Sequence, residues 1–199
     1  MTEKKSFLLA AGVLGLVVLV IGALWLGSRS GETSLAGVPD REVPAALQGD
    51  RDAVVGGTER EAIPVESTDP ISMRVYMSPL CGCCGGWVDH VKEYGFEPEV
   101  LHRDNMGPVK EAFRIPWQLS SCHTAVVNGY VIEGHVPGED VRRFLAEAPD
   151  AHGLTVPGMP IGSPGMESPD GRVEAYEVLL IGPAGQTEVY ARHGPVDPR

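Results

Sequence analysis

The sequence predicts an α/β domain over residues 70–199, because strand-like and helix-like patterns alternate there and two apolar runs flank an Asn-Gly turn. A chain of 199 residues is long enough for one buried core with accessory segments. All four cysteines fall within the same region. We therefore expect a single functional domain whose chemistry centres on its thiols.

The first half of this domain is expected to alternate strands with helices. Apolar residues recur there with the period of two that strands need and the period of 3.6 that helices need. The predicted elements are a strand at 73–77, a helix at 83–94, a strand at 96–102 and a short helix at 109–113.

The next part contains the clearest local signal, a hairpin within residues 124–136. Asn128 and Gly129 stand between two apolar runs, and this dipeptide favours the type I′ turn of a two-residue hairpin. A helix with one apolar face is expected to follow at 139–147. The resulting order, β-α-β-α-β-β-α over about residues 71–149, resembles the thioredoxin fold.

From residue 151 onward the chain is expected to extend that fold. A Gly-, Pro- and Met-rich loop comes first, and strands at 175–181 and 187–191 are expected to form an added hairpin.

The N-terminal region is expected to lie outside the domain. Residues 6–27 carry no charge and are long enough to cross a bilayer, and Lys4 and Lys5 precede them, so we expect a transmembrane anchor (residues 1–27) with a cytoplasmic N-terminus. The alternative is a cleaved signal peptide. Residues 28–69 lack Cys, His and aromatic residues, and their composition predicts a disordered acidic linker. The domain would then lie in the periplasm, tethered to the inner membrane.

The overall charge excludes one class of partner. The formal net charge is -11, whereas a nucleic-acid-binding surface needs excess positive charge to neutralise phosphates. We therefore expect no nucleic-acid partner.

The cysteines are clustered, which points to chemistry rather than to a disulfide framework. Cys81, Cys83 and Cys84 lie within four positions at a strand-to-helix junction, where helix N–H groups favour thiolates. A crowded thiol cluster suits soft ions such as Cu(I), whereas zinc sites use more widely spaced ligands. Metal binding is the favoured interpretation. The alternatives are a metal-free redox pair, Cys81 with Cys84, and a structural bridge.

Further ligands are expected near the hairpin. In a thioredoxin-like arrangement the loop before the hairpin faces the thiols, so Cys122 should approach them. A two-residue turn also sets the register so that Cys122 opposes His135. His123 and His135 are candidate nitrogen ligands, against the alternative that each imidazole merely forms a hydrogen bond at a strand end.

Other histidines and two methionines complete the candidates. His90 is expected to pack or cap rather than bind metal, and the remaining histidines have no supporting context. Met159 and Met166 lie in the Gly/Pro-rich loop, where a thioether could bind copper without deprotonation. The alternative is that they are ordinary surface residues.

Several separated motifs together resemble the CopG-like family of periplasmic copper-resistance proteins. The motifs are Cys81-Gly-Cys83-Cys84-x-x-Trp87-x-x-His90, Ser121-Cys122-His123-Thr124, the run from Gly129 to Pro137 that contains His135, and the run from Val156 to Glu167 that contains Met159 and Met166.

This resemblance implies that the Cys-x-Cys-Cys domain binds copper as Cu(I), including as a multinuclear cluster, with histidine and methionine help. It also implies a role in copper resistance that includes interconversion of copper oxidation states. Expected partners are copper ions, the membrane through the N-terminal helix, and a copper-export or chaperone protein. The alternative function is a thiol-disulfide oxidoreductase in which Cys81 attacks and Cys84 resolves.

Overall fold

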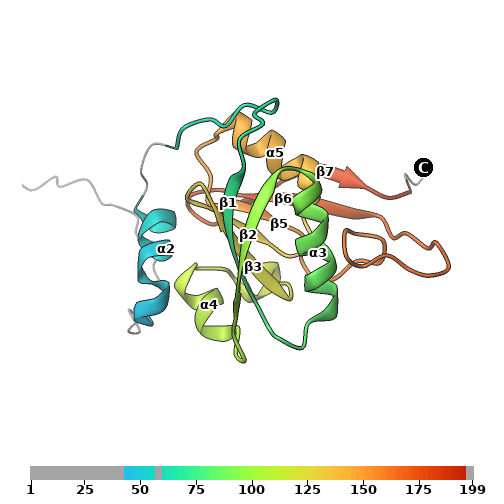
Figure 1. The fold of residues 1–199 in the computed structure, drawn as a ribbon, viewed down its shortest axis with the longest axis horizontal. Coiled ribbons are helices and arrows are strands. Elements are labelled where there is room, and N and C mark those ends of the chain that lie inside the picture. The colour runs from blue at the N-terminus through green and yellow to red at the C-terminus, as the bar shows by residue number, and fades with distance from the viewer. Residues whose placement is uncertain (1–42, 57–59, 196–199) are drawn as a thin grey trace, which may run out of the picture. The chain divides into compact units, whose positions relative to one another are not determined.

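The computed structural model describes residues 43–56 and 60–195, which form one mixed α/β domain (Figure 1). In chain order the elements are α2 (Ala45–Val55), β1 (Ile71–Met77), α3 (Gly82–Glu93), β2 (Phe96–His102), α4 (Gly107–Ala112), η1 (Trp117–Leu119), β3 (His123–Val127), β4 (Tyr130–Glu133), α5 (Gly138–Glu147), β5 (Gly153–Thr155), β6 (Tyr176–Ile181) and β7 (Thr187–His193).

Seven strands form one sheet in the order β2-β1-β3-β4-β5-β6-β7. β1 runs parallel to β2 and antiparallel to β3, so it joins the first strand-helix-strand unit to the hairpin. The hairpin pairs Val127 with Tyr130 and Thr124 with Glu133, the register expected for an Asn-Gly turn. Asn128 and Gly129 both have positive φ, as a type I′ turn requires.

Helices cover both faces of the sheet (Figure 1). On one face, α3 and α5 pack against apolar residues of the central strands, with Trp87 and Phe144 fully buried. On the other face, α2 and α4 pack against Tyr76, Val126 and Val131. Because both faces are covered, β3 and β4 are buried at every position.

The predicted order of elements from β1 to α5 and the added C-terminal hairpin are confirmed. Residues 96–102 are predicted to the residue, and the other elements differ by a few positions at their ends. The short strand β5 was not predicted. It pairs in parallel with β4 and antiparallel with β6, and thereby joins the C-terminal hairpin to the main sheet.

The expectation of a disordered linker over residues 28–69 is wrong for part of its length. α2 forms within it, and Leu47 and Val54 of this helix are buried against the sheet. The Asp50 carboxylate accepts hydrogen bonds from Arg74 and from the Tyr76 hydroxyl. Arg60 then donates to the carbonyls of Val54, Gly129 and Ala151, so this segment is fixed to the domain. Burial of Leu47 and Val54, together with these side-chain hydrogen bonds, orders this segment although its polar composition predicts disorder.

The expected transmembrane segment, residues 6–27, lies outside the described residues. In the described part of the chain, none of the helices combines the length and apolarity that a membrane crossing requires.

Candidate metal centre

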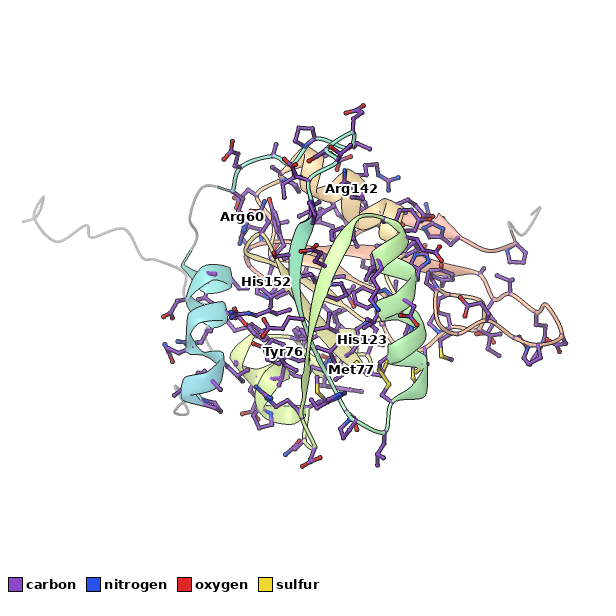
Figure 2. All side chains as sticks on the ribbon, in the orientation of Figure 1. Arg60, Tyr76, Met77, His123, Arg142 and His152 are labelled. Carbon is purple, nitrogen blue, oxygen red and sulfur yellow. A yellow bond between two sulfur atoms is a disulfide. The ribbon has the colours of Figure 1, made fainter. Side chains whose placement is uncertain are left out.

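The candidate site forms at one end of the sheet, where three chain segments meet. β1 ends at Met77, which pairs with His123, the first residue of β3. After β1 the chain turns through residues 78–80 into α3, whose N-cap residue is Cys81. Figure 2 shows Met77 and His123 at this end of the sheet, beside the first turn of α3. The antiparallel pairing of β1 with β3 therefore brings Cys122 to the thiols of α3.

Packing rather than helix propensity holds the first turn of α3. Its first five residues include Gly82, Gly85 and Gly86, and glycine is a poor helix former. Cys84, Trp87, Val88 and Val91, spaced for one helix face, are buried in the core. This buried face fixes the orientation of the helix start, and with it the directions of the sulfur atoms.

The four cysteine sulfurs lie within 4.8 Å of one another, as the sequence analysis predicted for Cys122. Cys81 and Cys84 form a disulfide, while Cys83 and Cys122 are free thiols. The Cys83 sulfur is 3.5 Å from that of Cys81 and 4.0 Å from that of Cys122. Cys84 is fully buried, whereas Cys81, Cys83 and Cys122 are partly exposed, so solvent reaches the site from their side.

Two imidazoles lie next to Cys122 and form a second donor group with it. The Cys122 sulfur is 3.0 Å from His135 Nε2 and 3.3 Å from His123 Nδ1. The predicted approach of Cys122 to His135 is thus confirmed. On the other side of the His135 ring, Nδ1 lies 2.8 Å from the Pro164 carbonyl, which accepts a hydrogen bond from Nδ1–H and leaves Nε2 with a free lone pair.

Burial sets the protonation of this group. Loss of hydration lowers the pKa of His123 well below its usual value and also lowers the pKa of His135, so both rings are neutral near pH 7. Burial, reinforced by the neighbouring Cys83, raises the pKa of Cys122 to about 11. Neutral imidazoles are ready to bind a metal, whereas Cys122 must first release its proton.

A buried ion pair, absent from the sequence analysis, supports the segment that carries Cys122 and His123. Glu133 is fully buried, and its carboxylate accepts hydrogen bonds from the Ser121 N–H (2.6 Å), the Thr124 hydroxyl (2.8 Å) and Lys110 Nζ. The Glu133 carboxylate therefore holds both ends of the segment from Ser121 to Thr124. The sequence signal was an acidic residue inside an otherwise apolar strand.

Trp87 supports the same ligands from the helix side. Its indole N–H donates to the Val136 carbonyl at 2.8 Å, and its ring lies 4.4 Å from the His123 ring, centroid to centroid. His123 Nε2 is buried without a hydrogen-bond partner among the described residues. The tilted contact with the indole therefore fixes the ring of His123 by packing.

The Met-rich loop reaches the site through its backbone. The Pro164 carbonyl contacts His135, and Gly165 packs against the first turn of α3. Met166 follows directly and is partly buried, whereas 52% of Met159 is exposed. The loop thus borders the cluster as expected, while a ligand role for either thioether stays a prediction.

Three of the remaining histidines have structural partners elsewhere. His90 accepts a hydrogen bond from the Gly138 N–H at the start of α5, and its ring makes a tilted contact with that of Tyr94, which agrees with the packing or capping role expected for it. His152 contacts the Phe113 carbonyl, and His193 pairs with Asp140. His102 is exposed at the end of β2.

A family match and two solved structures agree on what this chain is similar to. Residues 119–166, which include Cys122 and both loop methionines, match a family described as "Protein of unknown function, DUF411". None of the curated proteins matches the chain. Two solved structures, entitled "Copper resistance protein copG- Form 2" and "Form 1", match with 39% and 38% identity and TM-scores of 0.60. They cover 63% and 64% of this chain, and the match spans 100% of each of them.

This chain belongs to the CopG family. The resemblance inferred from its motifs is therefore confirmed. The mixed seven-stranded sheet agrees with the structural match to CopG, and the residues of this CopG-family protein that gather in space are those the motifs singled out.

The donor set suits a soft ion. Four sulfurs and two neutral imidazoles converge, and the buried Glu133 carboxylate is directed to Lys110, Ser121 and Thr124 instead. Thiolates and imidazoles favour copper and zinc over Mg²⁺ or Ca²⁺, which take oxygen ligands. This CopG-family site therefore fits copper chemically.

Proposed function

We propose that this protein binds copper as Cu(I), as cargo, in a thioredoxin-like domain that serves copper resistance. The observation that carries the proposal is the gathering of four cysteine sulfurs, from two distant segments, within 4.8 Å. Cu(I) prefers such ligands, and one thiolate can bridge two ions. The names of the two matching structures, both copper resistance proteins, support copper as the ion.

In this proposal the reduced protein is the form that takes up most copper. Reducing the Cys81–Cys84 bridge frees two more sulfurs beside Cys83 and Cys122. His123 and His135 would add nitrogen ligands, and Met159 and Met166 would add thioethers from the neighbouring loop. Such a set holds either a single ion or a multinuclear cluster.

The test is an anaerobic Cu(I) titration of the reduced full-length protein, followed by measurement of copper per chain. We expect at least one copper per chain, and a loss of most of it in the double variant Cys83→Ser/Cys84→Ser. Less than one copper in the parent, or full retention in the double variant, would overturn the proposal. Met166→Leu and Met159→Leu test the thioethers, with Met106→Leu, in another part of the fold, as the matched control.

A second candidate is a thiol-disulfide oxidoreductase, because Cys81 and Cys84 are bridged and Cys81 is the more exposed sulfur. Disulfide exchange needs neither Cys83 nor copper. Disulfide reductase turnover that persists in Cys83→Ser with a copper chelator present would favour this candidate. Interconversion of copper oxidation states at the same site is the related proposal: the Cys81–Cys84 dithiol would be oxidised to the disulfide, releasing two protons and the two electrons that convert two Cu(II) ions to Cu(I).

We further propose that residues 6–27 anchor the protein in the inner membrane, with the domain in the periplasm. The uncharged segment and the preceding lysines support this. Protein that stays in the membrane fraction after a salt wash, and is cut by protease in spheroplasts, would agree. Release by salt would contradict it. A periplasmic domain could then pass copper to an export or chaperone partner.

A further inference from the structure

The Met-rich loop contains one tight turn whose geometry is well defined. Ser163, Pro164, Gly165 and Met166 form a turn closed by the Met166 N–H, which donates to the Ser163 carbonyl at 2.8 Å. Proline in the second position and glycine with φ of +82° in the third are the pattern of a type II β-turn. The Met166 carbonyl then accepts the Gly162 N–H at 2.8 Å, which fixes the residue after the turn as well.

This turn lies directly against the first turn of α3, at a contact between two glycines. A Cβ atom on Gly86 would lie 2.9 Å from the Gly165 Cα. A Cβ atom on Gly165 would lie 2.5 Å from both the Cys83 carbonyl oxygen and the Trp87 nitrogen. Backbone therefore meets backbone here, and there is no room for even a methyl group on either side.

The contact joins three parts of the candidate metal centre. On α3 it involves the backbone of Cys83. One residue before Gly165, the Pro164 carbonyl binds His135 Nδ1 and so directs Nε2 toward Cys122. One residue after Gly165 stands Met166. A shift of the turn would therefore move both Met166 and the Pro164 carbonyl that orients His135.

We propose that the Gly86–Gly165 contact, which we name the glycine lock, is a positioning device that holds the C-terminal loop in place for metal binding. Gly86 and Gly165 are positioning residues: they act through Pro164, His135 and Met166. The proposal rests on the proposed function, since it requires that His135 or Met166 contact the bound ion. Groups that orient metal ligands in this way typically change metal affinity by ~10- to 100-fold when they are lost.

The decisive experiment compares Gly86→Ala with Gly85→Ala. Both residues lie in α3, and alanine improves the helix propensity of each by about the same amount. A Cβ atom on Gly85 meets nothing within 4 Å, whereas one on Gly86 meets Gly165. We expect Gly86→Ala to weaken Cu(I) affinity by ~10-fold or more, and Gly85→Ala to leave it unchanged. Equal affinities in the two variants would overturn the proposal.

A second pair tests the other side of the lock without metal. Gly165→Ala is compared with Gly171→Ala, because Gly171 also has a positive φ (+74°) but has nothing within 4 Å of an added Cβ. In the apo protein the His135 Nδ1–H should give a slowly exchanging proton NMR signal, owing to its bond with Pro164. We expect Gly165→Ala to lose this signal and Gly171→Ala to keep it. Retention in both variants would refute the lock.

The two proposals can fail separately. If the parent protein binds no Cu(I) while the His135 signal still depends on Gly165, the proposed function fails and the positioning contact stands as a structural feature. If the parent binds Cu(I) and Gly86→Ala binds it equally well, the glycine lock is wrong and the copper proposal is unaffected.

Discussion

Replacing Lys110 with methionine should destabilise the domain strongly, because it leaves the Glu133 carboxylate buried without its cation. Glu133 is fully buried, and the Lys110 side chain is 13% exposed. Removing one partner of a buried ion pair costs about 3 to 5 kcal/mol. We expect the lower end, ~3 kcal/mol, because the Ser121 N–H and the Thr124 hydroxyl continue to solvate the carboxylate.

The measurement is urea unfolding of the copper-free protein at pH 7 for Lys110→Met, Glu133→Gln and the double variant. The double variant removes both charges, so it should be more stable than the sum of the single losses predicts, by about 2 kcal/mol. A loss below about 1 kcal/mol for Lys110→Met would show that water, rather than Lys110, compensates the charge.

The stability loss caused by Lys110→Met should depend on pH in a defined direction. Burial raises the pKa of Glu133 in the folded protein, and Lys110 opposes this rise. A raised carboxyl pKa favours the folded state below the unfolded-state pKa, and that contribution disappears as the pH rises through the folded pKa. Without Lys110 the pKa rises further, so the stability loss should shrink between pH 7 and pH 5. A loss that grows on acidification would refute the electrostatic explanation.

Three further outcomes follow from other parts of the structure. Because burial raises the pKa of Cys122 to about 11, the rate of its alkylation by iodoacetamide should increase about tenfold per pH unit from pH 7 to 10. Mass spectrometry measures this rate, and a plateau below about pH 9 would contradict the prediction. Trp87→Phe removes the donor to the Val136 carbonyl and should lower the free energy of unfolding in urea by about 1 to 3 kcal/mol. No measurable change would mean that water replaces the indole N–H as the donor. Leu47→Ala should cost about 2 to 3 kcal/mol, because Leu47 is buried where α2 covers the sheet; the exposed Gln48→Ala is its control, and equal stabilities would mean that α2 does not pack.

The parts of the fold that were predictable are those whose signal is local. The period-two pattern of residues 96–102 and the Asn128-Gly129 turn specify their structures through nearby residues alone. That turn also gave the approach of Cys122 to His135, because hairpin register follows from turn length. The clustering of Cys81, Cys83 and Cys84 required no folding argument at all.

The missed parts depend on contacts between distant segments. α2 has two buried apolar residues and a polar surface, so only its packing against Tyr76 and neighbours distinguishes it from a linker. β5 has three residues, too few for a pattern, and forms because β4 and β6 lie on either side. Glu133 and Lys110 are 23 residues apart, and neither reveals the other in the sequence.

The bridge between Cys81 and Cys84 joins residues only three positions apart, at the start of α3. A cross-link that closes so small a ring contributes about 2 kcal/mol to folding, far less than one that ties remote parts of a chain. The apolar face of α3 is buried in the core, so packing as well as the bridge holds this helix in place. We therefore expect the bridge to open and close without loss of the fold.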